Sequence, residues 1–195
     1  MKREICFIGV DGSGKTTFST LLYHFLRKRG YGVKVIKVTN IMRPFSIIIN
    51  KYRGTKKSII KNKENGFFLS ILICMIIFIF ELLVLIFVKC ILLRKKNIII
   101  FDRFFYYLFY EFIRNDVLSY KLANVLIDPR FVILLHIDPN IILYRLHQKH
   151  DKEKSIKYFK KMSEWFLLLA YNKNFTVIHN NKMEKVFLKI VSYVK

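Results

Sequence analysis

Cysteine is scarce in this chain, and histidine nearly so. The three cysteines lie far apart in apolar surroundings, with neither the spacing of a metal site nor the pattern of a disulfide framework: Cys6, Cys74 and Cys90. None of the five histidines has a partner at metal-binding spacing, and no serine or cysteine triad is present. We therefore expect core cysteines in a reducing compartment, and chemistry that uses no protein nucleophile.

Acidic residues are also few, since 13 of them face 35 lysines and arginines and leave a formal net charge of +22. Such an excess favours binding to polyanions, whether a nucleotide, a nucleic acid or an anionic membrane surface. The chain is equally rich in Ile, Lys, Asn and Phe together, which is typical of A+T-rich coding sequence. Composition alone thus accounts for the charge as well as function does, and we expect no specific nucleic-acid partner.

The length of 195 residues predicts a single domain, 1–195, that buries its own core. No secretion signal is expected, because the apolar run after Lys2-Arg3 is too short and leads directly into a glycine-rich loop. The sequence therefore predicts a cytoplasmic protein, with membrane association left open by an apolar segment described below.

A phosphate-binding pattern dominates the first part of the chain. Residues 9–16 match G-x-x-x-x-G-K-[ST] at every fixed position: Gly9, Val10, Asp11, Gly12, Ser13, Gly14, Lys15 and Thr16. An apolar run at 5–8 precedes the loop and fits a buried strand, and apolar residues at helical spacing follow it. The order of strand, glycine loop and helix is the one that such a site requires.

The residue types in this loop suit a triphosphate. Glycines let main-chain N–H groups approach phosphate without a Cβ clash, and the start of the following helix adds its positive dipole end. We expect Lys15 to reach the β- and γ-phosphates and the Thr16 hydroxyl to bind the accompanying Mg²⁺. ATP and Mg²⁺ are therefore the predicted cofactors.

A second candidate cluster follows the apolar run at 98–101, which ends in Asp102-Arg103. At the carboxyl end of a parallel strand, Asp102 is placed to hold Mg²⁺ and Arg103 to clamp a phosphate, although a structural salt bridge would use the same pair. Tyr106 is placed either to stack on a base or to pack in the core. Arg43, after the second strand, is a further candidate phosphate contact or a solvated surface arginine.

Strand and helix patterns alternate along the rest of the chain. Apolar or alternating runs predict parallel strands at 5–8, 33–38, 98–101, 131–136 and 175–178. Gly30 is expected to end the first helix, Asp138 to cap the helix that carries Arg145, and the last helix to span 183–194. We expect a three-layer α/β/α fold with a five-stranded parallel sheet.

Residues 67–93 form an apolar segment interrupted only by Ser70, Glu81 and Lys89. Its length would suffice to cross a bilayer, but a crossing would separate the strand at 98–101 from the phosphate-loop strand with which it must share a sheet. Three alternatives remain: a long core helix, a helix whose exposed face forms a homodimer, or a helix that lies shallowly in a membrane surface. A polar, basic span at 147–155 suits a mobile lid over phosphates.

The chain resembles the thymidylate kinase family and the wider group of thymidylate-kinase-like P-loop kinases. The resemblance is carried by residues 7–17 and by 98–104, with weaker support from 134–145 and 158–170. It implies phosphoryl transfer from ATP to a nucleoside monophosphate, most simply dTMP. It also implies these roles: Asp11 beside the acceptor, Arg103 on its phosphate, Asp102 organising Mg²⁺, Thr17 in the ATP site, and Arg145 with the lid over the ATP phosphates.

The chain departs from the family pattern in several places. Arg43-Pro44-Phe45 lacks the usual glutamate, and the region 78–85 is apolar where the family carries a base-reading arginine. The lid has lysines in place of arginines, and His136 replaces an acidic residue. Two other functions therefore remain open. One is a membrane-associated kinase acting on a lipid-linked or sugar acceptor, and the other is a non-catalytic ATP-binding regulatory module.

Overall fold

A computed structural model describes residues 3–37, 97–112, 116–126, 128–147, 156–180 and 182–194, with eight further positions between 72 and 87. Five parallel strands form one sheet in the order β2-β3-β1-β4-β5. They are β1 (Glu4–Ile8), β2 (Val33–Lys37), β3 (Ile98–Asp102), β4 (Phe131–His136) and β5 (Thr176–His179). The predicted α/β fold is confirmed, and each strand begins and ends within one residue of its expected range.

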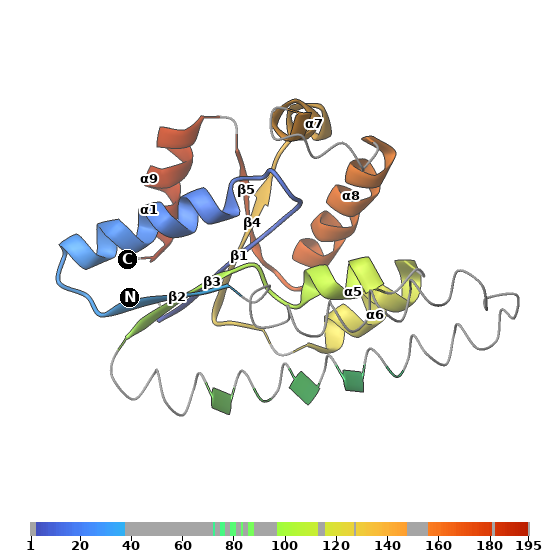
Figure 1. Cartoon of the computed structure of the whole chain (residues 1–195), viewed down its shortest axis with the longest axis horizontal. Coiled ribbons are helices and arrows are strands. Elements are labelled where there is room, and N and C mark those ends of the chain that lie inside the picture. The colour runs from blue at the N-terminus through green and yellow to red at the C-terminus, as the bar shows by residue number, and fades with distance from the viewer. Residues whose placement is uncertain are drawn as a thin grey trace, which may run out of the picture.

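Helices cover both faces of the sheet (Figure 1). One face carries α1 (Lys15–Lys28) and α9 (Met183–Val194). The other carries α5 (Tyr106–Phe112), α6 (Asp116–Val125), α7 (Pro139–His147) and α8 (Ile156–Asn172). Because side chains alternate along a strand, Ile5 and Phe7 pack toward α1 and α9, whereas Cys6 and Ile8 pack toward α8. Burial on both faces explains why these strands are continuous apolar runs.

The helix ends follow the predicted chemistry. Gly30 has φ +81° beyond α1, and the N–H of Tyr31 donates to the carbonyl of Leu26 at 3.2 Å. At the start of α7, the Asp138 carboxylate accepts the N–H of Asn140 at 2.7 Å. Both expected helix boundaries are therefore confirmed, and α9 begins and ends at the predicted residues. Cys6 is a buried free thiol, as expected, whereas Cys74 and Cys90 lie outside the described residues.

The described positions of the apolar segment are helical, and seven of the eight side chains are exposed. They lie at helical spacing and form what we call the apolar stripe: Leu72, Met75, Ile76, Ile79, Leu83, Ile86 and Phe87. Phe80 instead packs against the core cluster beneath α5 and α8. None of the helices in the described part of the chain combines the length and hydropathy needed to cross a bilayer.

Two other predicted features cannot be placed. Arg43, the candidate acceptor contact, lies outside the described residues, as does nearly all of the lid at 147–155.

Candidate active site

The phosphate loop leaves the central strand β1 at the carboxyl edge of the sheet, the edge where open parallel sheets bind ligands (Figure 1). Its glycines at 9, 12 and 14 have φ of +135°, +81° and +95°, conformations that other residues rarely adopt. Gly9 also lies so close to β4 that a Cβ there would stand 2.6 Å from the carbonyl oxygen of Leu135. The glycines thus serve close packing as well as the phosphate approach expected from the sequence.

Lys15, the first residue of α1, is buried with its ammonium inside the loop. Its Nζ donates to the Val10 carbonyl at 2.5 Å and lies 3.4 Å from the Ser13 hydroxyl oxygen, so both partners are uncharged. Burial lowers the pKa of Lys15 to about 8, opposed by the charge of Asp11 and reinforced by that of Arg103. Phosphate oxygens around this buried ammonium would compensate its charge and stabilise its protonated form.

Thr16 and Asp102 meet as the sequence predicted, although 86 positions separate them. The Thr16 hydroxyl donates to Asp102 Oδ2 at 2.9 Å. Asp102 is buried, and its Oδ1 has no hydrogen-bond partner among the residues that the structure describes. A buried carboxylate oxygen without a donor, next to a hydroxyl, fits a hard cation that prefers oxygen ligands. The residues present therefore fit a Mg²⁺ ion.

Asp11, Arg103 and Tyr107 form a second group at the same edge. An Arg103 Nη lies 3.1 Å from the Asp11 carboxylate, which also accepts the Tyr107 hydroxyl at 3.3 Å. The guanidinium carbon of Arg103 lies 5.4 Å from the centre of the Tyr107 ring. Arg103 has φ +73°, a strained conformation for a residue other than glycine, and strain of this kind is concentrated at functional sites.

Arg145 reaches the loop from α7, where one Nη donates to the Gly12 carbonyl at 3.1 Å. Val10 and Ser13 are buried in the loop, and Thr17 is exposed on the first turn of α1. The predicted loop residues, Asp102, Arg103 and Arg145 thus gather at one edge of the sheet.

Tyr106 occupies a different place from the one expected of an acceptor contact. The side chain is fully buried, its hydroxyl donates to Asp128, and its ring packs against Phe104 and Phe175. This position supports the alternative of core packing, and Tyr107 is the tyrosine of this helix that faces the site.

Sequence reasoning missed two features of the site. Asn180, directly after β5, donates its side-chain amide to the Ser13 carbonyl at 2.8 Å. His136 and His179 end the neighbouring strands β4 and β5, with ring centres 5.0 Å apart, and Ser163 lies 3.2 Å from the His136 ring. Burial, with a smaller contribution from His179, lowers the pKa of His136. The usable signal was topological, because the ends of parallel strands share one edge of a sheet.

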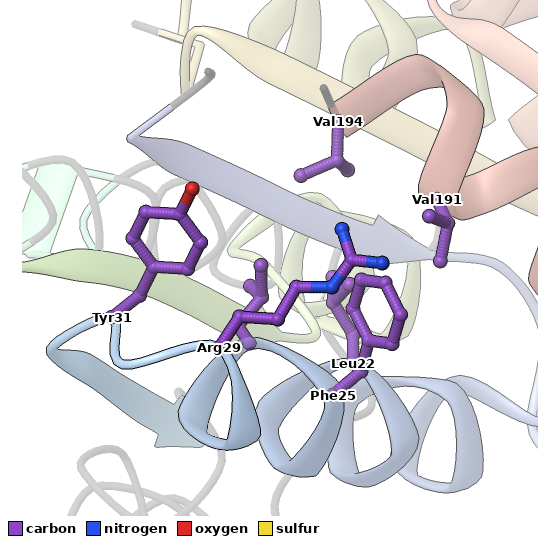
Figure 2. Close-up of a pocket in the computed structure, with 7 residues that line it drawn as sticks. Leu22, Phe25, Arg29, Tyr31, Val191 and Val194 are labelled. Atoms are coloured by element: carbon purple, nitrogen blue, oxygen red, sulfur yellow. The ribbon is translucent and has the colours of Figure 1, made fainter.

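A partly open hollow of about 110 Å³ lies elsewhere, between the carboxyl-terminal parts of α1 and α9 (Figure 2). It is lined mainly by apolar side chains, together with Arg29 and Tyr31. Its residues belong to the end of α1 opposite the phosphate loop, and its volume is well below the several hundred Å³ of a nucleotide-sized site. The hollow is therefore separate from the candidate active site.

Comparison with known proteins agrees with this geometry. The sequence profile described as thymidylate kinase matches residues 7–190. A protein named probable thymidylate kinase, from Sulfurisphaera tokodaii, is 26% identical over 204 positions that cover 100% of this chain and 96% of its own length. The crystal structure of thymidylate kinase from Ehrlichia chaffeensis superposes with a TM-score of 0.54 at 20% identity, covering 100% of this chain and 99% of the other, which supports the fold alone. On the match of the family profile over most of its length, this chain belongs to the thymidylate kinase family.

Proposed function

We propose that this protein transfers the γ-phosphoryl group of ATP to a nucleoside monophosphate, with dTMP as the acceptor. The observation that carries the proposal is the hydrogen bond from Thr16 to the buried Asp102 beside Lys15, in which one carboxylate oxygen is left without a donor among the described residues. Family membership and the Asp11–Arg103 pair at the same edge add support.

Each residue has a task in this proposal. The loop N–H groups and Lys15 bind the β- and γ-phosphates, and Thr16 and Asp102 hold the Mg²⁺ ion, which neutralises phosphate charge when bound. Arg103 binds the acceptor phosphate as a fixed guanidinium fork, and Asp11 orients that fork. Phosphoryl transfer needs alignment and charge neutralisation more than covalent chemistry, so a site built of lysine, arginine and carboxylates suffices.

The test is ADP release from Mg-ATP by the purified protein in the presence of a panel of nucleoside monophosphates. We expect dTMP to raise turnover well above the rate without acceptor, and Asp102→Asn to remove the stimulation. If ATP binds and no monophosphate stimulates turnover, dTMP kinase activity is contradicted and a non-catalytic ATP-binding module becomes the better description.

A second candidate function is phosphoryl transfer to a lipid-linked or sugar acceptor at a membrane face, and one observation favours it. The apolar stripe exposes seven large side chains, and basic residues flank the segment on both sides in the sequence: Lys61, Lys63, Arg94, Lys95 and Lys96. This candidate predicts co-sedimentation with anionic liposomes and ADP release with a polyprenol or sugar acceptor. Sedimentation of the liposomes without the protein contradicts it, and a concentration-dependent dimer would instead indicate that a second copy covers the stripe.

A further inference from the structure

We infer that Asn180 is a positioning residue that fixes the Ser13–Gly14 peptide of the phosphate loop, so that the N–H of Gly14 faces the bound phosphates. The inference rests on the proposed function only in that it places phosphates in this loop. The evidence lies in two hydrogen bonds of a residue that follows β5, far from the loop in sequence, and in its close approach to Gly14.

Asn180 is itself firmly held. It is one of the few buried polar side chains among the described residues, with 6% of its surface exposed. Its main-chain N–H donates to the His136 carbonyl at 2.8 Å, which anchors it to the end of β4. A residue anchored in this way presents its side-chain amide in one place.

The amide meets the loop at a single peptide group. Asn180 Nδ2 donates to the Ser13 carbonyl at 2.8 Å, and a Cβ placed on Gly14 would lie 2.9 Å from the same nitrogen. In a trans peptide the carbonyl of one residue and the N–H of the next point in opposite directions. With the Ser13 carbonyl held toward Asn180, the N–H of Gly14 must point away from it.

This peptide needs such a restraint because glycines lie on either side of Ser13. Gly12 and Gly14 both adopt positive φ, and glycine rotates between conformations at little steric cost. A flipped peptide would present its carbonyl oxygen, and not its N–H, to phosphate. The Arg145 contact with the Gly12 carbonyl restrains the preceding peptide in a similar way, so two successive carbonyls are held from outside the loop.

The experiment compares Asn180→Ala and Asn180→Leu with the parent protein in calorimetric titrations of Mg-ATP and of inorganic tripolyphosphate. We expect each variant to bind both ligands at least about tenfold more weakly than the parent does. Within one variant the loss should be the same for the two ligands, since the displaced Gly14 N–H binds phosphate. The KM for dTMP should stay within twofold. Asn180→Leu keeps a branched side chain and loses the donor without adding charge beside the phosphates, so it keeps the test open if the alanine variant does not fold.

Two control variants separate positioning from general stability. Asn172→Ala removes a comparable amide donor that binds Asn124 on the surface, and Ile190→Val lowers the melting temperature through the buried core of α9. Neither should change ATP affinity. Affinities within twofold of the parent in Asn180→Ala, or an equal loss in Ile190→Val, would overturn the inference. If the parent binds ATP and does not phosphorylate dTMP, the proposed function fails while the role of Asn180 is still measured.

Discussion

Two lysines whose side chains have little exposed surface differ in what surrounds them. Lys173 lies 2.8 and 3.0 Å from the two carboxylate oxygens of Asp128, and it also donates to the Leu126 carbonyl at 2.9 Å. Lys15 is more deeply buried, and its nearest partners are a carbonyl and a hydroxyl. A cation with its own carboxylate is already compensated in the folded state, whereas the charge of one among uncharged oxygens can be compensated by an anion that binds later.

The contrast extends to two adjacent residues at the start of α5. Tyr106 completes the Lys173 group, with its hydroxyl on Asp128 and its ring 5.7 Å from the ammonium. The next residue, Tyr107, contacts Asp11 and Arg103 at the candidate site. Tyr106 therefore belongs to a cluster in the interior of the fold, and Tyr107 belongs to the candidate active site. Substitutions in the two clusters should have different effects.

The largest effect is expected from Lys15→Met. We expect turnover to fall about 1,000-fold, because the phosphates lose their buried cation. The free energy of unfolding at pH 7 should stay equal or rise. The folded state lowers the pKa of Lys15 from 10.5 to about 8, so a protonated Lys15 opposes folding at neutral pH. Steady-state ADP release measures the turnover, and urea unfolding measures the free energy of unfolding. Retained turnover would mean that the site is misassigned.

Arg103→Gly should lower turnover about 100-fold through loss of the acceptor clamp. Glycine relieves the positive φ of this position and loses the Asp11 ion pair, so we expect the free energy of unfolding to change by less than about 1 kcal/mol. Arg103→Lys is the matched variant, because it keeps the charge without the fork. An unchanged KM for dTMP in both variants would argue against a role in acceptor binding.

Lys173→Met should show the reverse pattern. Removing the ammonium leaves the Asp128 carboxylate without its cationic partner and with the Tyr106 hydroxyl as its remaining donor among the described residues. We expect a loss of about 2 kcal/mol in the free energy of unfolding, reduced from the fully buried case because the Asp128 side chain is 30% exposed. Turnover well below the melting temperature should stay within twofold. Lys160→Met, on the exposed face of α8, serves as the control, and a loss of activity in Lys173→Met without a loss of stability would break the contrast.

The smallest effect concerns pH. Because the pKa of His136 is lowered in the folded state, the unfolded chain takes up the proton first as pH falls below about 6.5, and folding stability is lost there. His136→Gln should remove this part of the pH dependence, worth less than about 1 kcal/mol for a half-buried ring. Urea unfolding between pH 5 and 8 measures it, and identical slopes in parent and variant would contradict it.

The fold was predictable because its strands are buried on both faces and therefore form unbroken apolar runs. The phosphate loop was predictable because its residues are contiguous. Asp102 and Thr16 could both be assigned to a Mg²⁺ site although they are distant in sequence. Asp102 ends β3 and Thr16 follows β1, and these parallel strands end at the same edge of the sheet.

The remaining features depended on side-chain directions that the sequence does not encode locally. Tyr106 and Tyr107 differ only in helical phase after β3, and no periodicity in that aromatic run marks the buried one. The contact of Asn180 with Ser13 joins residues 167 positions apart through a side chain that carries no motif. The segment 67–93 is apolar on every side, so its pattern could not indicate that the apolar stripe would be exposed.

The most direct test is an NMR titration of the Lys15 side chain in protein labelled with ¹³C-lysine, with Lys15→Met to assign the signal. We predict a pKa of about 8 without nucleotide, and a higher pKa once Mg-ATP places phosphate charge around the ammonium. A pKa near 10.5 that does not change with Mg-ATP would contradict the account, because Lys15 would then be neither buried in the loop nor in contact with phosphate.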